Sequence, residues 1–229
     1  MKITASTLTR AAALAAMLGG ATYIAIQFIH PADEIASLAT RAWFNVHILS
    51  LAEAVLLMIG LAGIYLHQVR RFGLLGLIGY LMFAVFLVLQ AAFNFAEALI
   101  APLIAVDAPQ LAVDFVGLFG RYPAETDLGL LASVPLVGSI LYVGGALVLG
   151  IAIIRAGVLS RGAGILLIAA AAITPVAGAL LPHTLERMAA VPMGLAFVWL
   201  GVSLWRDLRK PGVGPLVDDE ARVAKASVV

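Results

Sequence analysis

The chain has 229 residues, of which 63% are hydrophobic and 12% charged, and its mean hydropathy is +1.08. A soluble domain is about half apolar and about a quarter charged, so this composition predicts an integral membrane protein with one compact domain. The formal net charge of +1 says nothing about nucleic acid, but no basic, aromatic-rich patch appears, so we expect no nucleic-acid partner. The lack of cysteine excludes disulfides, thiol catalysis, iron–sulfur clusters and Cys-ligated zinc.

Six apolar runs are long enough for membrane-spanning helices, which need about 20 residues each. They cover residues 8–29, 43–67, 73–100, 129–154, 162–181 and 188–205. The alternating pattern of a β-barrel is missing, so helices are the expected spanning element. The first run could be a signal peptide, but it is longer than the usual apolar segment and no small-residue cleavage motif follows it. We therefore expect it to remain as a helix.

The predicted fold is all-α, an integral membrane bundle of six transmembrane helices over residues 1–207. Residues 208–229, broken by Pro and Gly from Pro211 onward, are expected to form a mobile cytoplasmic tail. With the N-terminus in the cytoplasm, all but three of the 14 Lys and Arg residues fall on the cytoplasmic side. This bias predicts that both termini are cytoplasmic. The three exceptions are Arg41, Arg121 and Arg187.

Two outer connections carry structural signals. Segment 31–42 begins with Pro31, followed by Asp33 and Glu34, residues that favour the start of a helix. Segment 101–128 is rich in apolar residues, and Pro102 limits how far the preceding helix can extend. This second segment predicts either a short interfacial helix or a loop that packs over the helix ends. Its apolar residues are Leu111, Val113, Phe115, Val116, Leu118 and Phe119.

Polar side chains gather at the outer ends of the first three helices. Gln90, Asn94 and Glu97 are spaced i, i+4, i+7 and share one face of the third helix. The same spacing and the same depth recur on the first helix at Tyr23, Gln27 and His30, and the second helix carries a broader arc of His47, Ser50 and Glu53. The inner half has few polar groups. These patterns predict an outward-facing polar crevice with an apolar floor.

Each of these residues also has a structural interpretation. Glu53, the deepest charge, is either a functional group, as intramembrane carboxyls often are, or a structural acid bonded to Gln90 or Tyr142. Glu97 is either part of the site or an interfacial carboxylate in water. Gln90 and Asn94 are either ligand contacts or interhelical hydrogen-bonding groups. Pro175 frees a backbone carbonyl near Thr174, which gives either a kink in the crevice wall or a packing bend.

The histidines give no clear metal motif. His30, His47 and His183, with Glu53 or Glu97, offer ligand types that suit zinc, but they lie on separate elements without a spaced motif. We therefore predict no metal site and, because no phosphate-binding glycine loop is present, no cofactor. His67 lies beside Arg70 and Arg71 and is expected to be solvated.

Two stretches suggest a family. Residues 141–170, "LYVGGALVLGIAIIRAGVLSRGAGILLIAA", combine a Gly-rich helix, a short basic inner turn and a second apolar helix, and residues 181–201 are "LPHTLERMAAVPMGLAFVWLG". Both resemble segments of uncharacterised bacterial multipass proteins grouped as domains of unknown function. The resemblance could cover most of residues 8–207 and implies a six-helix protein of the bacterial inner membrane. It implies no substrate and no functional residues.

Four functional hypotheses remain open. The first is a site for a small-molecule or lipid-like ligand lined by Tyr23, Gln27, His30, His47, Glu53, Gln90, Asn94 and Glu97. The second is an intramembrane enzyme acting on a lipid or isoprenoid, with Glu53 as general acid and His47 or Glu97 as base. The third is proton-coupled transport with Glu53 as the proton carrier. The fourth is a structural protein whose polar groups hold the helices together.

Overall fold

The computed structural model describes residues 3–119 and 124–210, except for the side chains of residues 119, 183 and 184. Residues 211–229 of the predicted tail lie outside this part. The described chain folds into α-helices joined by short turns and 3-10 helices. The α-helices are α1 (Ala5–Ile29), α2 (Ile35–Leu38), α3 (Arg41–Leu99), α4 (Ala101–Asp107), α5 (Pro109–Val116), α6 (Val134–Ala156), α7 (Arg161–Leu180), α8 (His183–Glu186) and α9 (Val191–Asp207). The 3-10 helices are η1 (Gly117–Phe119), η2 (Gly129–Ser133) and η3 (Arg187–Ala190).

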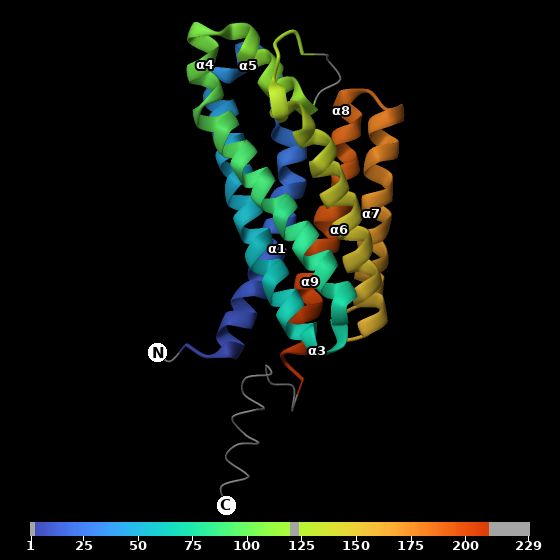
Figure 1. Ribbon diagram of the computed structural model, residues 1–229. Helices are drawn as coiled ribbons and strands as arrows, with labels where there is room; N and C mark the ends of the chain where they lie inside the picture. Colours follow the sequence, from blue (N-terminus) through green and yellow to red (C-terminus); the bar gives the residue numbers. More distant parts are fainter. Residues whose placement is uncertain (1–2, 120–123, 211–229) are drawn as a thin grey trace, which may run out of the picture.

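Five helices of the described part are long and apolar enough to cross a membrane: α1, α3, α6 with η2, α7, and α9 with η3. The 59 residues of α3 are interrupted at Gly73, whose φ of 56° and ψ of −158° are not helical. That conformation is almost confined to glycine. The chain reverses direction there, so α3 consists of two antiparallel halves, 41–72 and 74–99 (Figure 1).

The two ends of the bundle differ (Figure 1). One end, which we call the turn end, holds Gly73, the start of α1, the end of α9 and the link from α6 to α7, where Gly157 adopts a left-handed conformation. The opposite end, which we call the cap end, holds α2, α4, α5 and α8. Connections are therefore tight at the turn end and longer at the cap end, as the sequence predicts.

Small residues bring the helix backbones close together. A Cβ added to Gly60 of α3 would lie 2.7 Å from the backbone nitrogen of Ala16 in α1. A Cβ on Gly150 of α6 would lie 2.8 Å from the backbone oxygen of Gly164 in α7. Such contacts allow the van der Waals packing that holds membrane helices together.

The core and the outer surface are both apolar. A continuous core extends through the bundle and includes the fully buried Leu61, Ile64, Leu149, Leu167 and Phe197. Large apolar side chains also point outward along the whole length of the helices, a surface too extensive for a water-soluble monomer. Examples are Leu14, Ile59, Leu74, Leu81, Val88, Ile140, Ile165, Val176 and Trp199. Together with the five apolar helices, this surface is that of a membrane protein.

Segment 101–128 is partly helical, as the first alternative predicts, and packs over the helix ends, as the second predicts. Residues 101–119 form α4, α5 and η1, and these helices pack over the ends of the long helices rather than lying apart from them. Their apolar cluster contains Leu38, Trp43, Ala101, Ala112 and Val116. Pro102 stands in the first turn of α4, directly after α3 ends at Leu99.

Asp114 of α5 ties down the chain that follows it. Its side chain accepts hydrogen bonds from the hydroxyl of Thr126 and from the backbone N–H groups of Glu125 and Thr126, at 3.1 and 2.7 Å. The amide of Gln110 donates to its other oxygen at 2.9 Å. The Thr126 hydroxyl, followed by these other donors, holds the pKa of Asp114 below its usual value. The Asp114 carboxylate therefore fastens α5 to the segment of Glu125 and Thr126.

Candidate functional site

A cavity of about 420 Å³ lies between α1, the second half of α3, α6 and α7, toward the cap end. This volume falls within the range of small-molecule sites. One part of its wall is apolar and contains Phe86, Leu89, Phe93, Val116 and Val134. The other part is polar and contains Tyr23, His30, Asp33, Gln90, Asn94, Glu97, Thr174, Glu186 and Arg187. The cavity is therefore amphipathic, with apolar and polar side chains next to each other in its lining.

The structure brings together five of the eight predicted ligand-binding residues. Tyr23 and His30 of α1 and its C-cap line the cavity, as do Gln90, Asn94 and Glu97 of α3. The other three, Gln27, His47 and Glu53, lie outside the lining. Gln27 folds back on its own helix and donates to the backbone oxygen of Tyr23 at 2.8 Å.

Glu53 sits directly behind the polar wall. Its side chain is fully buried, and Gln90 donates its amide hydrogen to Glu53 Oε2 at 2.9 Å. This contact links the two halves of α3. Gln90 is one of the two partners predicted for a structural Glu53. Glu53 Oε1 and Gln90 Oε1 are both buried without a hydrogen-bond partner. Buried polar atoms are nearly always paired, so this pair leaves hydrogen-bonding capacity open at the cavity wall.

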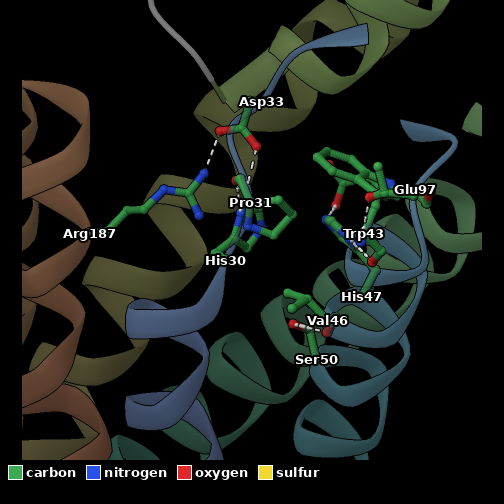
Figure 2. A network of polar contacts seen from close by, with 10 residues as sticks. His30, Pro31, Asp33, Trp43, Val46, His47, Ser50, Glu97 and Arg187 are labelled. Atoms are coloured by element: carbon green, nitrogen blue, oxygen red, sulfur yellow. Dashed lines mark hydrogen bonds and ion pairs between the residues drawn. The ribbon is translucent and has the colours of Figure 1, made fainter. Parts of the chain in front are cut away.

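His47 and Glu97 form a second buried pair. His47 Nδ1 lies 2.8 Å from the backbone oxygen of Trp43, which can only accept, so Nδ1 carries a hydrogen. Its other nitrogen, Nε2, lies 3.2 Å from Glu97 Oε2. One proton must therefore lie between His47 and Glu97, either on the imidazole or on the carboxyl. Figure 2 shows the two side chains facing each other.

Trp43 fixes this pair in position. Its indole N–H donates to the backbone oxygen of Glu97 at 2.8 Å, and its ring lies over the His47 ring with centroids 4.1 Å apart. Trp43 is fully buried. A tryptophan thus holds the first half of α3 against the second half at the level of the cavity.

A third set of polar side chains lines the cavity near the cap end. His30 donates from Nδ1 to the backbone oxygen of Pro31 at 2.7 Å, and Arg187 of η3 forms an ion pair with Asp33 (Figure 2). Burial lowers the pKa of His30 from its ordinary value to about 4, assisted by the nearby Arg187 charge. The His30 ring stands edge-on to the His47 ring at 5.0 Å. His30 is therefore neutral at pH 7.

Sequence reasoning missed part of the lining. Asp33 was placed as a helix-start residue and Arg187 as an outer-loop charge, yet they pair across 154 positions of the chain. No local pattern signals such a contact. Phe86 and Phe93 could have been found, because they lie four residues before Gln90 and four residues before Glu97 on the polar face. Thr174 does line the cavity, and its hydroxyl donates to the backbone oxygen of Ala170 at 3.0 Å.

Two further expectations concern the histidines. His67 is not solvated: its side chain is 5% exposed, and Nε2 lies 2.8 Å from Asp207 Oδ2 at the end of α9. The packing of α9 against α3 covers it, which its basic sequence neighbours did not indicate. Within residues 3–119 and 124–210, no three His, Cys, Asp or Glu side chains form a group that could hold a metal. The side chain of His183 lies outside the described part.

Comparisons of the chain with protein-family models, with curated proteins and with solved structures gave no match. The resemblance of residues 141–170 and 181–201 to bacterial multipass proteins therefore stays a prediction.

Proposed function

We propose that the protein is a six-span inner-membrane protein of bacteria that binds a small amphipathic molecule in the cavity at its cap end. Both termini and the turn end face the cytoplasm, and the cap end faces outward. Residues 41–72 and 74–99 of α3 are about 48 and 39 Å long at 1.5 Å per residue, more than the roughly 30 Å of a bilayer core. The two halves therefore count as separate spans beside α1, α6, α7 and α9.

The distribution of Lys and Arg supports this orientation. Arg70 and Arg71 beside Gly73 and Arg155 and Arg161 beside Gly157 all stand at the turn end. Such a concentration favours the cytoplasmic side. The family resemblance adds the bacterial inner membrane to this proposal.

The observation that carries the binding function is the amphipathic cavity itself. Phe86 and Phe93 lie beside Gln90 and Glu97 on the face of α3 that lines the cavity, and Gln90 leaves a buried oxygen unpaired there. Ligand sites typically combine such apolar surface with a few convergent polar groups. A structural protein would gain stability by filling this space, because empty volume weakens packing.

The packed turn end argues against a channel. Between the cavity and Gly73 the bundle is filled by apolar side chains such as Leu61, Ile64 and Leu149, all fully buried. A polar solute crossing the membrane would need polar partners along its whole path. The cavity is therefore a site with access from one side.

An intramembrane acid–base enzyme is a second candidate, and the His47–Glu97 pair favours it. The pair shares one proton, and Glu97 lines the cavity, so a substrate group there could receive or give that proton. Under this hypothesis, Glu97 exchanges a proton with the substrate, and His47 Nε2 is the other atom that can hold that proton. Glu53 is less suited, because Gln90 stands between it and the cavity.

Native mass spectrometry of the protein in nanodiscs made directly from its own membrane tests the binding function. A Cβ at Gly138 would meet no atom within 4 Å, although Gly138 lines the cavity. We therefore expect Gly138→Leu to fill the cavity while the protein stays folded. The wild type should carry a small-molecule adduct that Gly138→Leu lacks. Identical adducts on both proteins, or none on either, would overturn the proposal.

A further inference from the structure

We propose that the head group of the ligand is a primary ammonium attached to an apolar chain. This inference rests on the proposed binding function and names the chemical class that the same cavity takes. It follows from three properties of the polar wall: which atoms lack partners, which charges are present, and how the apolar surface is placed beside them.

The unpaired atoms are acceptors. Gln90 lines the cavity, and its Oε1 is buried without a hydrogen-bond partner. Glu53 Oε1 is also unpaired, but it lies behind Gln90 and outside the lining. Asn94 adds to this bias, because its Nδ2 donates to the backbone oxygen of Gln90 at 2.8 Å and leaves the amide oxygen as its free group. An unpaired buried acceptor costs about 1–3 kcal/mol. A ligand head group that donates hydrogen bonds would satisfy these acceptors, whereas a carboxylate or a fully ionised phosphate would not.

The number of acceptors favours an ammonium over a hydroxyl. A hydroxyl has one hydrogen to donate, whereas an ammonium has three. Gln90 Oε1 and the amide oxygen of Asn94 stand on the same helix face one turn apart, and Glu53 lies immediately behind Gln90. A head group with several donors can pair with more than one of these atoms at once.

The charges of the wall point the same way. Three carboxyl groups line the cavity, those of Asp33, Glu97 and Glu186, and the positive charge of Arg187 is paired with Asp33. The lining therefore has more carboxyl groups than cationic groups, so a cationic head group suits it better than an anionic one.

The apolar wall receives the rest of the molecule. Phe86 and Phe93 lie one turn before Gln90 and Glu97, so apolar surface continues directly from the polar groups. Aromatic faces also attract an ammonium. The cavity therefore fits a molecule with a charged end and an alkyl or aryl body.

Three eight-carbon probes that differ in their head group test the inference: octylamine, octanol and octanoate at pH 7. Octylamine is then a cation and octanoate an anion, as amine and carboxyl groups generally are at this pH. Trp43 provides the signal, because it lies against His47 and Glu97. Replacing the other two tryptophans, as Trp199→Phe and Trp205→Phe, leaves Trp43 as the single reporter.

We expect octylamine to change Trp43 fluorescence saturably, at least tenfold more tightly than octanol, while octanoate has no saturable effect. Gly138→Leu should abolish the saturable signal and leave the signal from partition into the bilayer. Gln90→Leu should weaken octylamine binding at least tenfold. Gln27→Leu is the matched control, because the Gln27 amide is bonded to its own helix outside the cavity, and should bind like the parent protein.

The outcomes separate the two proposals. If octanol or octanoate binds as tightly as octylamine and Gly138→Leu removes that binding, the ammonium inference fails and the binding function stands. If no probe gives a saturable signal that Gly138→Leu removes, both proposals fail. If Gln90→Leu and Gln27→Leu weaken binding equally, the role of the Gln90 oxygen is refuted.

Discussion

The turn half and the cap half of the bundle use the same helices in opposite ways. In the turn half, Gly60 lies close to Ala16 and Gly150 lies close to Gly164. The buried Asp207 is paired there with His67 and Lys210, although Gln68 Oε1 is buried without a partner. In the cap half, the helices enclose a cavity, and polar atoms of Glu53 and Gln90 remain unpaired. Tight packing in one half thus holds the helices in place, so that the other half can tolerate empty space.

The strongest test of this comparison makes the same substitution in both halves. Gly60→Val should destabilise the protein by about 3 kcal/mol or prevent folding, since its Cβ would approach the backbone of Ala16. Gly138→Val should leave the unfolding free energy within about 1 kcal/mol, because its side chain enters the cavity. Unfolding in mixed micelles measures both. Equal losses in the two variants would contradict the contrast between the halves.

A second test separates the structural role of Glu53 from its proposed ligand role. Glu53→Ala should lower the unfolding free energy by about 1–3 kcal/mol, because the buried amide of Gln90 loses its acceptor. Glu53→Gln keeps an acceptor at that place, so stability and octylamine affinity should both stay close to those of the parent protein. A large loss of octylamine affinity in a folded Glu53→Gln protein would show that the Glu53 carboxyl itself takes part in binding.

The smallest expected effect concerns pH. The pKa of His30 is about 4 in the folded protein and about 6.5 in an unfolded chain, so the unfolded state takes up a proton first as the pH falls. Stability should therefore decrease from pH 7 to pH 5, on the order of 1 kcal/mol. The wild type is compared with His30→Gln at each pH, which cancels the contributions of Asp33, Arg187, His47 and Glu97. A pH dependence that is the same in both proteins would refute this assignment.

The sequence predicted the helices and one wall of the site for clear physical reasons. Spanning helices need long apolar runs, and the six runs match the observed helices apart from short extensions at their ends. The i, i+4, i+7 spacing placed Gln90, Asn94 and Glu97 on one helix face, and that face does line the cavity.

The failures have equally physical causes. Gln27 shares a face with Tyr23 and His30, but a glutamine can bond the carbonyl one turn earlier, and Gln27 does so. His67 was assigned by its charged neighbours in sequence, whereas its environment depends on α9, 140 positions away. The ion pair of Asp33 with Arg187 likewise depends on tertiary packing. Periodicity along one helix carries no information about which other helix will cover it.

Gly73 joins the two halves of α3 without a loop, so neither half has slack to slide along the other. The wall formed by Gln90, Asn94 and Glu97 is therefore mechanically tied to His47 and Glu53. We expect a ligand to enter by movement of the opposite side, where Pro175 cannot donate the helical hydrogen bond to the preceding turn of α7. The folded-back α3 is therefore the side of the cavity that we expect to stay fixed, and α7 around Pro175 is the side that we expect to move.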